Sequence, residues 1–277
     1  MIQPLFLKLG GSLITDKTGV EVVREDVLAR LAREIAEVRA KNPAMRLVIG
    51  HGSGSFGHVA GAEFGTRQGV KTEAEWAGFA AVSDAASRLN RLVISALISA
   101  GVPAISLQPS ASAICEDGQI STLADEPVRD ALHAGLLPVV FGDVAFDRVR
   151  GGTIISTEEV LIFLARTLRP SWFLLAGETP GVLDEEGKIV PLITADNFDQ
   201  IAPALGGSRG TDVTGGMVGK VISMLNLVDA IPESRVRVFS GLPQKNLFRV
   251  LIDPTLPLGT ELRSADTSLG ARLRKFD

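Results

Sequence analysis

Short apolar runs alternate with amphipathic helical patterns along most of this 277-residue chain. The apolar runs predict strands, and apolar residues spaced three and four positions apart predict helices. Strands are expected at residues 4–9, 46–50, 103–107, 137–141, 172–176 and 235–239, helices at 24–39, 73–100, 158–168 and 214–230, and one or two short strands at 247–260. This alternation indicates an α/β fold with a mainly parallel central sheet.

Glycine-rich loops follow three of the predicted strands, near Gly10, Gly50 and Gly142. Open α/β sheets bind ligands at the carboxyl ends of their strands, so these loops are the candidate binding sites. The helix at 158–168 is expected to end near Arg169, because Pro170 cannot continue it. We therefore expect a single domain, 1–277, built from two lobes, 1–169 and 170–277.

Composition argues against several classes of function. The net charge of −4 gives no general positive field for nucleic acid. No run approaches the roughly 18 apolar residues of a membrane span, and the first residues lack the pattern of a signal peptide. Cys115 is the single cysteine, which excludes an intramolecular disulfide and fits a reducing compartment, so we expect a cytoplasmic protein.

The first glycine loop is Lys8-Leu9-Gly10-Gly11-Ser12, with Lys17 five residues beyond it. Glycines at the end of a strand let backbone N–H groups approach phosphate oxygens closely. The two lysines would place cations on either side of a polyphosphate. The alternative is a plain turn with solvated lysines.

The second loop reads His51-Gly52-Ser53-Gly54-Ser55-Phe56-Gly57-His58. Its glycines and serines supply amides and hydroxyls for an oxyanion, and His58 is expected to face the cleft, although a lone histidine is often a satisfied core group. The string also matches the dinucleotide pattern Gly-x-Gly-x-x-Gly. However, it follows the second strand and shows no clear acidic partner for a ribose, so a nicotinamide site is disfavoured.

The third loop, residues 212–220, places Gly215, Gly216 and Gly219 at the start of a helix that carries Lys220. A helix N-terminus attracts phosphate, and Lys220 is one turn inside it. Acidic residues follow the central strands. Asp143 and Glu158 could orient nearby lysines, whereas Glu159 could equally cap its helix through Ser156 or Thr157.

Other nucleotide and catalytic motifs are missing from the sequence. It contains no Walker A pattern and no His/Cys cluster with metal-ligand spacing, so no residue is predicted to ligate a metal. Gly206-Gly207-Ser208-Arg209-Gly210 matches the esterase string. It lacks the strand-turn-helix setting of a nucleophile elbow, and no histidine follows it, so a serine hydrolase is disfavoured.

Taken in order, KLGGSLITDK, HGSGSFGH, FGDV and DVTGGMVGK resemble the motif series of the amino-acid-kinase superfamily, over about residues 4–260. The GSFGH string resembles the isopentenyl phosphate kinase branch. The resemblance implies a three-layer α/β sandwich, an acceptor-binding amino-terminal half, an ATP-binding carboxyl-terminal half and a homodimer. It also implies transfer of the ATP γ-phosphoryl group, with Mg²⁺, to isopentenyl phosphate in isoprenoid synthesis of the mevalonate type.

The same resemblance assigns roles to residues by position. Catalytic roles fall to Lys8, Lys17, His58 and Lys220; ATP binding to Lys8, Gly10, Gly11, Ser12, Glu178, Gly216 and Lys220; and acceptor binding to Ser53, Gly54, His58, Gly142 and Asp143. Phe79 and Val82 lie on one face of the following helix and could wall the prenyl tail, or could simply be core.

Three departures from the family pattern stand out. Ser53 replaces a glycine, Glu158 replaces an aspartate, and residues 176–181 replace the usual nucleotide-side loop. Two alternatives therefore stay open. One is a sister kinase with a carboxylate, carbamate or phosphonate acceptor, against which His58 argues. The other is a non-catalytic nucleotide-binding regulatory module, against which the three lysines argue.

Overall fold

The chain is built around one large sheet. The computed structural model describes residues 3–16, 18–57, 65–205 and 216–265. The eight strands lie in the order β12-β14-β13-β11-β1-β4-β8-β5, and every neighbouring pair is parallel except β13 and β14. Their bounds are β1 Leu5–Leu9, β4 Leu47–His51, β5 Ala104–Ser106, β8 Leu137–Phe141, β11 Trp172–Gly177, β12 Leu192–Ile193, β13 Arg235–Ser240 and β14 Thr260–Leu262. The predicted α/β fold with a mainly parallel sheet is confirmed.

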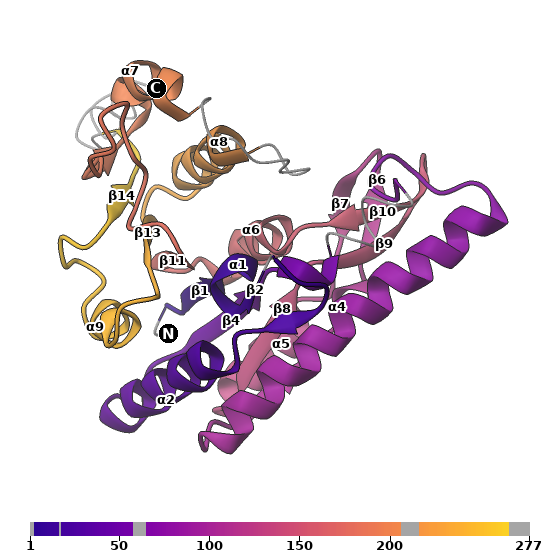
Figure 1. Cartoon of the computed structure of the whole chain (residues 1–277), viewed down its shortest axis with the longest axis horizontal. Coiled ribbons are helices and arrows are strands. Elements are labelled where there is room, and N and C mark those ends of the chain that lie inside the picture. Colours follow the sequence, from indigo (N-terminus) through magenta and orange to yellow (C-terminus); the bar gives the residue numbers. More distant parts are fainter. Residues whose placement is uncertain (1–2, 17, 58–64, 206–215, 266–277) are drawn as a thin grey trace, which may run out of the picture.

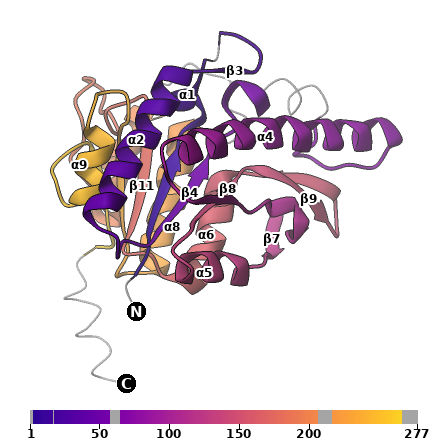
Figure 2. The same cartoon turned by 90° about the horizontal axis from the view of Figure 1, so that it is seen from below.

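Helices cover both faces of this sheet and make a three-layer structure, seen in Figures 1 and 2. In Figure 2, α2 and α4 lie on one side, and α5 and α6 on the other. The helices are α1 Gly11–Ile14, α2 Glu25–Lys41, α4 Glu73–Ser99, the 3₁₀ turn η1 Pro109–Ala111, α5 Glu126–His133, α6 Thr157–Leu168, α7 Ala195–Leu205, α8 Gly216–Ala230 and α9 Asn246–Ile252. Within the described ranges, no helix is both long and apolar enough to cross a bilayer.

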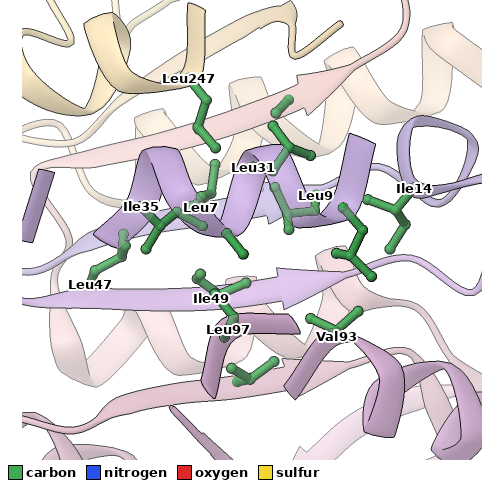
Figure 3. Packing of buried hydrophobic residues seen from close by; sticks show 14 of the residues in the cluster. Leu7, Leu9, Ile14, Leu31, Ile35, Leu47, Ile49, Val93, Leu97 and Leu247 are labelled. Atoms are coloured by element: carbon green, nitrogen blue, oxygen red, sulfur yellow. The ribbon is translucent and has the colours of Figure 1, made fainter. Parts of the chain in front are cut away.

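The central strands are buried on both faces because side chains alternate between the two helical layers. Leu7 and Leu9 of β1 pack in one cluster with α2, α4 and α9, and Figure 3 shows Leu7 and Leu9 beside Leu31 of α2 and Ile49 of β4. Phe6 points the other way, into a second cluster with α5, α6 and α8. Two apolar layers therefore hold β1 rigidly at the middle of the sheet.

A smaller sheet and a hairpin flank the central sheet. The smaller sheet has the order β10-β9-β6-β7, with bounds β6 Ile114–Glu116, β7 Gln119–Thr122, β9 Asp143–Asp147 and β10 Gly151–Ile155. Helix α4 packs against β9. The hairpin pairs β2 Thr15–Asp16 with β3 Val22–Val23 directly after α1.

The segment at residues 247–260 differs from the sequence prediction. Residues 247–260 were expected to form strands, but they contain helix α9, and the strand β14 begins only at Thr260. Leu247, Val250 and Leu251 are buried at helical spacing. Glu34 of α2 accepts hydrogen bonds from the backbone N–H groups of Lys245 and Phe248, both at 3.0 Å. A partner distant in the sequence thus satisfies the first amides of this short helix.

Candidate active site

Four loops leave the central sheet at the same level. Leu9 at the end of β1 lies opposite Ala176 of β11 and His51 of β4, and His51 lies opposite Phe141 of β8. The ladder continues one step further, because Gly10 N–H donates to the Ala176 carbonyl at 2.8 Å and Gly52 N–H to the Leu9 carbonyl at 3.0 Å. The loops that follow β11, β1, β4 and β8 therefore start side by side.

The loops after β1 and β4 touch through their backbones. A Cβ atom built on Gly11 would lie 2.3 Å from the backbone nitrogen of Gly54, and one on Gly52 would lie 2.8 Å from that of Gly11. Gly54 has a φ of +50°, a left-handed conformation that glycine adopts without strain. Only glycines permit this approach, so the close contact explains why both loops are glycine-rich.

A cavity of about 530 Å³ opens above these loops. Most of the predicted site residues within the described ranges line it. On the predicted nucleotide side they are Lys8, Gly10, Gly11, Ser12, Glu178 and Lys220, and on the predicted acceptor side they are Ser53, Gly54, Val82, Gly142 and Asp143. The fold thus brings residues from both halves of the sequence to a single hollow.

Two lysines and a carboxylate lie together in the lining of the cavity. Lys8 on β1 forms an ion pair and hydrogen bond with Glu158, the second residue of α6. Burial alone would raise the pKa of Glu158, but the charge and hydrogen bond of Lys8, with the charge of Lys220, hold that pKa below its ordinary value. Glu158 is therefore ionised at neutral pH. It holds Lys8 in one position and limits the repulsion between the two lysines.

The start of α6 is fixed by its neighbours. Ser156 and Glu159 form a reciprocal capping box, and the Thr157 hydroxyl donates to the His51 carbonyl at 2.6 Å. Gly50 leaves room for the helix, because a Cβ there would lie 2.6 Å from a Thr157 methyl carbon. The helix is thus seated directly on β4, and this seating sets the position of Glu158.

Glu159 has a second partner that the sequence did not predict. Arg67, which also lines the cavity, donates to both carboxylate oxygens of Glu159, at 2.9 and 2.6 Å. The Arg67 carbonyl accepts from the Thr153 hydroxyl at 3.1 Å. The capping role of Glu159 is confirmed, and the same carboxylate ties the chain entering α4 to α6.

Comparison with known proteins agrees with this geometry. A family model described as the amino acid kinase family matches residues 3–240. The chain belongs to the amino acid kinase family. It is 35% identical over 270 residues to an isopentenyl phosphate kinase of Methanothermobacter thermautotrophicus, covering 94% of this chain and 97% of that one. It is 42% identical over 225 residues to an isopentenyl phosphate kinase of Haloferax volcanii, covering 80% and 87%.

A solved structure of an isopentenyl phosphate kinase has the same fold. It superposes with a TM-score of 0.78 at 29% sequence identity, over 93% of this chain and 99% of that chain. The resemblance to the amino acid kinase family and to its isopentenyl phosphate kinase branch, expected from the four glycine motifs, is therefore confirmed.

His51, at the start of the second glycine loop, is a core residue of this family member. It is buried and stacks on Phe141, with ring centroids 5.4 Å apart. Its Nε2 lies 3.1 Å from the Asn90 amide nitrogen, and its Nδ1 lies 3.2 Å from the Gly52 carbonyl. Burial lowers its pKa to about 4, so the ring is neutral and donates from Nδ1 to Gly52.

Asp143 lines the cavity, but its carboxylate is occupied within the protein. It accepts hydrogen bonds from the Ser83 hydroxyl at 3.0 Å, the Gln108 amide at 3.2 Å, and the backbone N–H groups of Ser110 and Val144 at 3.2 and 2.8 Å. An anion would also repel a phosphate acceptor. The structure thus favours a supporting role for Asp143, joining α4 to η1, over direct acceptor binding.

The two residues predicted to line the prenyl tail of the acceptor differ in position. Val82 lines the cavity, together with Ala86 and Ile154. Phe79 lies behind this wall, in a cluster with Val70 and Val144, and its ring packs edge-on against Trp76 at 5.2 Å. A Cβ on Gly152 would come within 2.9 Å of the Phe79 ring, so Phe79 backs the wall.

The unusual loop after β11 is held by contacts of its own. Glu178 forms an ion pair with Arg24 at 2.8 Å, and its carbonyl accepts from the Ser240 hydroxyl at 2.9 Å. Arg24 directly precedes α2 and follows the β2–β3 hairpin. The loop that departs from the family pattern is therefore bonded to the residue before α2 and to the end of β13.

Three predicted residues have little or no structural account. Lys17 and His58 lie outside the described residues, and Gly216 is described only as the first residue of α8. His58 directly follows Gly57, which lines the cavity. Their roles stay predictions from the sequence.

Proposed function

We propose that this protein transfers the γ-phosphoryl group of ATP to the phosphate of isopentenyl phosphate, forming ADP and isopentenyl diphosphate. The observation that carries the proposal is the backbone contact between two glycine loops that line the same cavity as Lys8, Glu158 and Lys220. One loop suits a polyphosphate donor and the other a phosphate acceptor, and their contact brings the two phosphates together. Family membership and the isopentenyl phosphate kinase relatives support the same reaction.

The acceptor needs no strong general base. The second pKa of a phosphate ester is about 6, so its oxygen is largely ionised at neutral pH. The main obstacle is the repulsion between two anions, which preorganised cations and amides offset in the transition state. Lys8 and Lys220 supply positive charge in the cavity, and Lys17 is proposed to stabilise the transferring phosphoryl group. His58 is assigned a hydrogen bond to the acceptor phosphate, beside Ser53 and Gly54.

The two sides of the cavity then divide the substrates. Gly10, Gly11, Ser12 and the Glu178 loop face the nucleotide, with the start of α8 at Gly216. Gly142 and Val82 line the acceptor side, where Val82 and Ala86 meet the prenyl tail. The proposed lobes, 1–169 for the acceptor and 170–277 for the nucleotide, match this division except at Gly10, Gly11 and Ser12, which lie in the first lobe but face the nucleotide.

Mg²⁺ is proposed to enter bound to ATP. Across the residues that the structure describes, no group of three or more His, Cys, Asp or Glu side chains could hold a metal. Mg²⁺ commonly binds through substrate phosphates and water with few protein ligands, which fits this cavity. When bound, it neutralises charge on the β- and γ-phosphate oxygens. We also propose a homodimer, as the family resemblance implies, and a cytoplasmic location.

A coupled ADP-release assay tests the reaction. The panel contains isopentenyl phosphate, N-acetylglutamate, carbamate and fosfomycin, with Mg²⁺ and ATP, and ³¹P NMR identifies the product. We expect ADP release only with isopentenyl phosphate, together with diphosphate resonances. Release with another acceptor would instead indicate a sister kinase. ATP binding without turnover on any acceptor would indicate a nucleotide-binding regulatory module.

A further inference from the structure

Thr15 lies at the junction of the two glycine loops. It ends α1, begins β2, and its side chain is fully buried. Its hydroxyl donates a hydrogen bond to the Gly11 carbonyl at 2.8 Å and accepts one from the Ser55 backbone N–H at 2.9 Å. Gly11 belongs to the loop after β1, and Ser55 to the loop after β4. A single hydroxyl thus bridges the two loops.

The bridge uses the full donor capacity of the hydroxyl. A threonine hydroxyl has one proton to donate and lone pairs to accept, and Thr15 spends the proton on one loop and a lone pair on the other. Gly54 lies against it so closely that a Cβ there would be 2.0 Å from the Thr15 oxygen. The position therefore fixes both the direction and the separation of the loops.

The contact also orients the donor loop. The Gly11 carbonyl accepts from both the backbone N–H and the hydroxyl of Thr15. In a trans peptide the next N–H points away from that carbonyl, so the Ser12 N–H is directed away from Thr15. Ser12 lines the cavity.

The second loop is tied to the hairpin as well. The Ser55 hydroxyl is buried and lies 3.2 Å from the Val22 nitrogen and 3.4 Å from the Val22 carbonyl oxygen, so it can both accept and donate. The loop after β4 is therefore bonded to β2 through Thr15 and to β3 through Val22. Movement of one loop relative to the other would break these buried bonds.

We propose that Thr15 is a positioning residue that sets the spacing between the donor and acceptor phosphates. The inference rests on the proposed phosphoryl transfer between the two loops. Transfer requires the attacking oxygen to lie about 3–3.5 Å from phosphorus, and a misplacement of 1 Å can cost about 100-fold in rate. The hydroxyl acts through the loops and does not itself touch the substrate.

The test compares Thr15→Val with Thr15→Ser. Valine keeps the shape and removes both hydrogen bonds, whereas serine keeps the hydroxyl. We expect Thr15→Val to lower kcat about 100-fold while the KM values and the calorimetric Kd for ATP stay within about threefold. The ADP released per phosphorylated acceptor should rise, because water replaces a displaced acceptor. Thr15→Ser should restore coupled turnover.

Ser234→Ala is the matched control. It removes a fully buried hydroxyl that donates to the Pro170 carbonyl at the amino end of the sheet, and it should lower stability without changing the coupling ratio. A Thr15→Val enzyme within threefold of the wild-type kcat, or an equal loss in Thr15→Ser, would overturn the proposal. The variants are assayed with whichever acceptor the wild type phosphorylates, so an error in the proposed acceptor is detected separately.

Discussion

Replacing Gly11 by alanine is expected to push the two glycine loops apart. The new Cβ would lie 2.3 Å from the Gly54 backbone nitrogen and 2.6 Å from its Cα. The first distance is about 1.1 Å short of the 3.4 Å at which ordinary contacts begin. Both obstructing atoms are backbone, so no side-chain rotation can relieve the overlap, and one loop must shift by about an ångström.

A shift of that size has a predictable effect on transfer. Misplacing the reacting atoms by about 1 Å costs on the order of 100-fold in rate, or about 2.7 kcal/mol of transition-state stabilisation. Each substrate still meets its own loop, so the KM values should change much less than kcat. The assay is steady-state ADP release with both substrates varied, alongside urea denaturation to measure stability.

Gly135→Ala is the control that distinguishes a loss of activity from a loss of stability. Gly135 has a φ of +76°, and its new Cβ would meet no atom within 4 Å. Alanine should destabilise the fold by about 1–2 kcal/mol through the left-handed backbone, with kcat unchanged because the turn between α5 and β8 lies at the amino end of the sheet. If a folded Gly11→Ala enzyme kept a kcat within threefold of wild type, the loop contact would not set the reaction geometry.

Two further predictions concern a buried histidine and the acceptor tail. Burial lowers the pKa of His51 from its ordinary value of 6.5 to about 4 in the folded protein. As the pH falls from 6.5 towards 4, only the unfolded chain therefore gains this proton. The free energy of unfolding then decreases by up to about 1.4 kcal/mol per pH unit. Urea titrations between pH 7 and 5 should show a smaller slope in His51→Gln, and identical slopes would contradict a buried neutral ring. Val82→Ala should raise kcat/KM for geranyl phosphate relative to isopentenyl phosphate, since each accommodated methylene contributes about 0.8 kcal/mol. An unchanged ratio of kcat/KM for the two phosphates in Val82→Ala would mean that the prenyl tail lies elsewhere. Phe79→Ala should mainly destabilise the fold, by about 3–5 kcal/mol.

The elements predicted from sequence are those with strong local patterns. The strand at residues 137–141 and the helix that starts at Glu73 were predicted with the observed starts, because continuous apolar runs and helical spacing record burial directly. The glycine loops were also predicted, since parallel strands end at one edge of the sheet. Helix α9 was mistaken for strand, because its apolar stretch, residues 247–252 with Arg249 inside it, is short. Its first amides are satisfied by Glu34, over two hundred residues away.

The sequence predicted most residues of the candidate site, but not which side chains contact one another. Lys8 and Glu158 were each singled out, but their ion pair spans 150 positions, and only the fold brings them together. Arg67 gave no signal, because its partner Glu159 already had a sufficient explanation as a helix cap. Thr15 lies inside the motif KLGGSLITDK, but the sequence assigns it no role, because a threonine hydroxyl has no distinct chemistry there until the fold brings the two loops together.

The strand order has a consequence for how such an enzyme can change its substrate. The loop after β1 lies between the loop after β4, on the proposed acceptor side, and the loop after β11, on the proposed nucleotide side. Substitutions in α4 or in the loop after β4 can therefore alter the accepted molecule and leave the opposite side of β1 untouched. The acceptor specificity can therefore change during evolution while the binding of the ATP donor is retained. Any recruited acceptor must still bring its nucleophilic oxygen within reach of a donor bound beside β1, about 3–3.5 Å from the phosphorus.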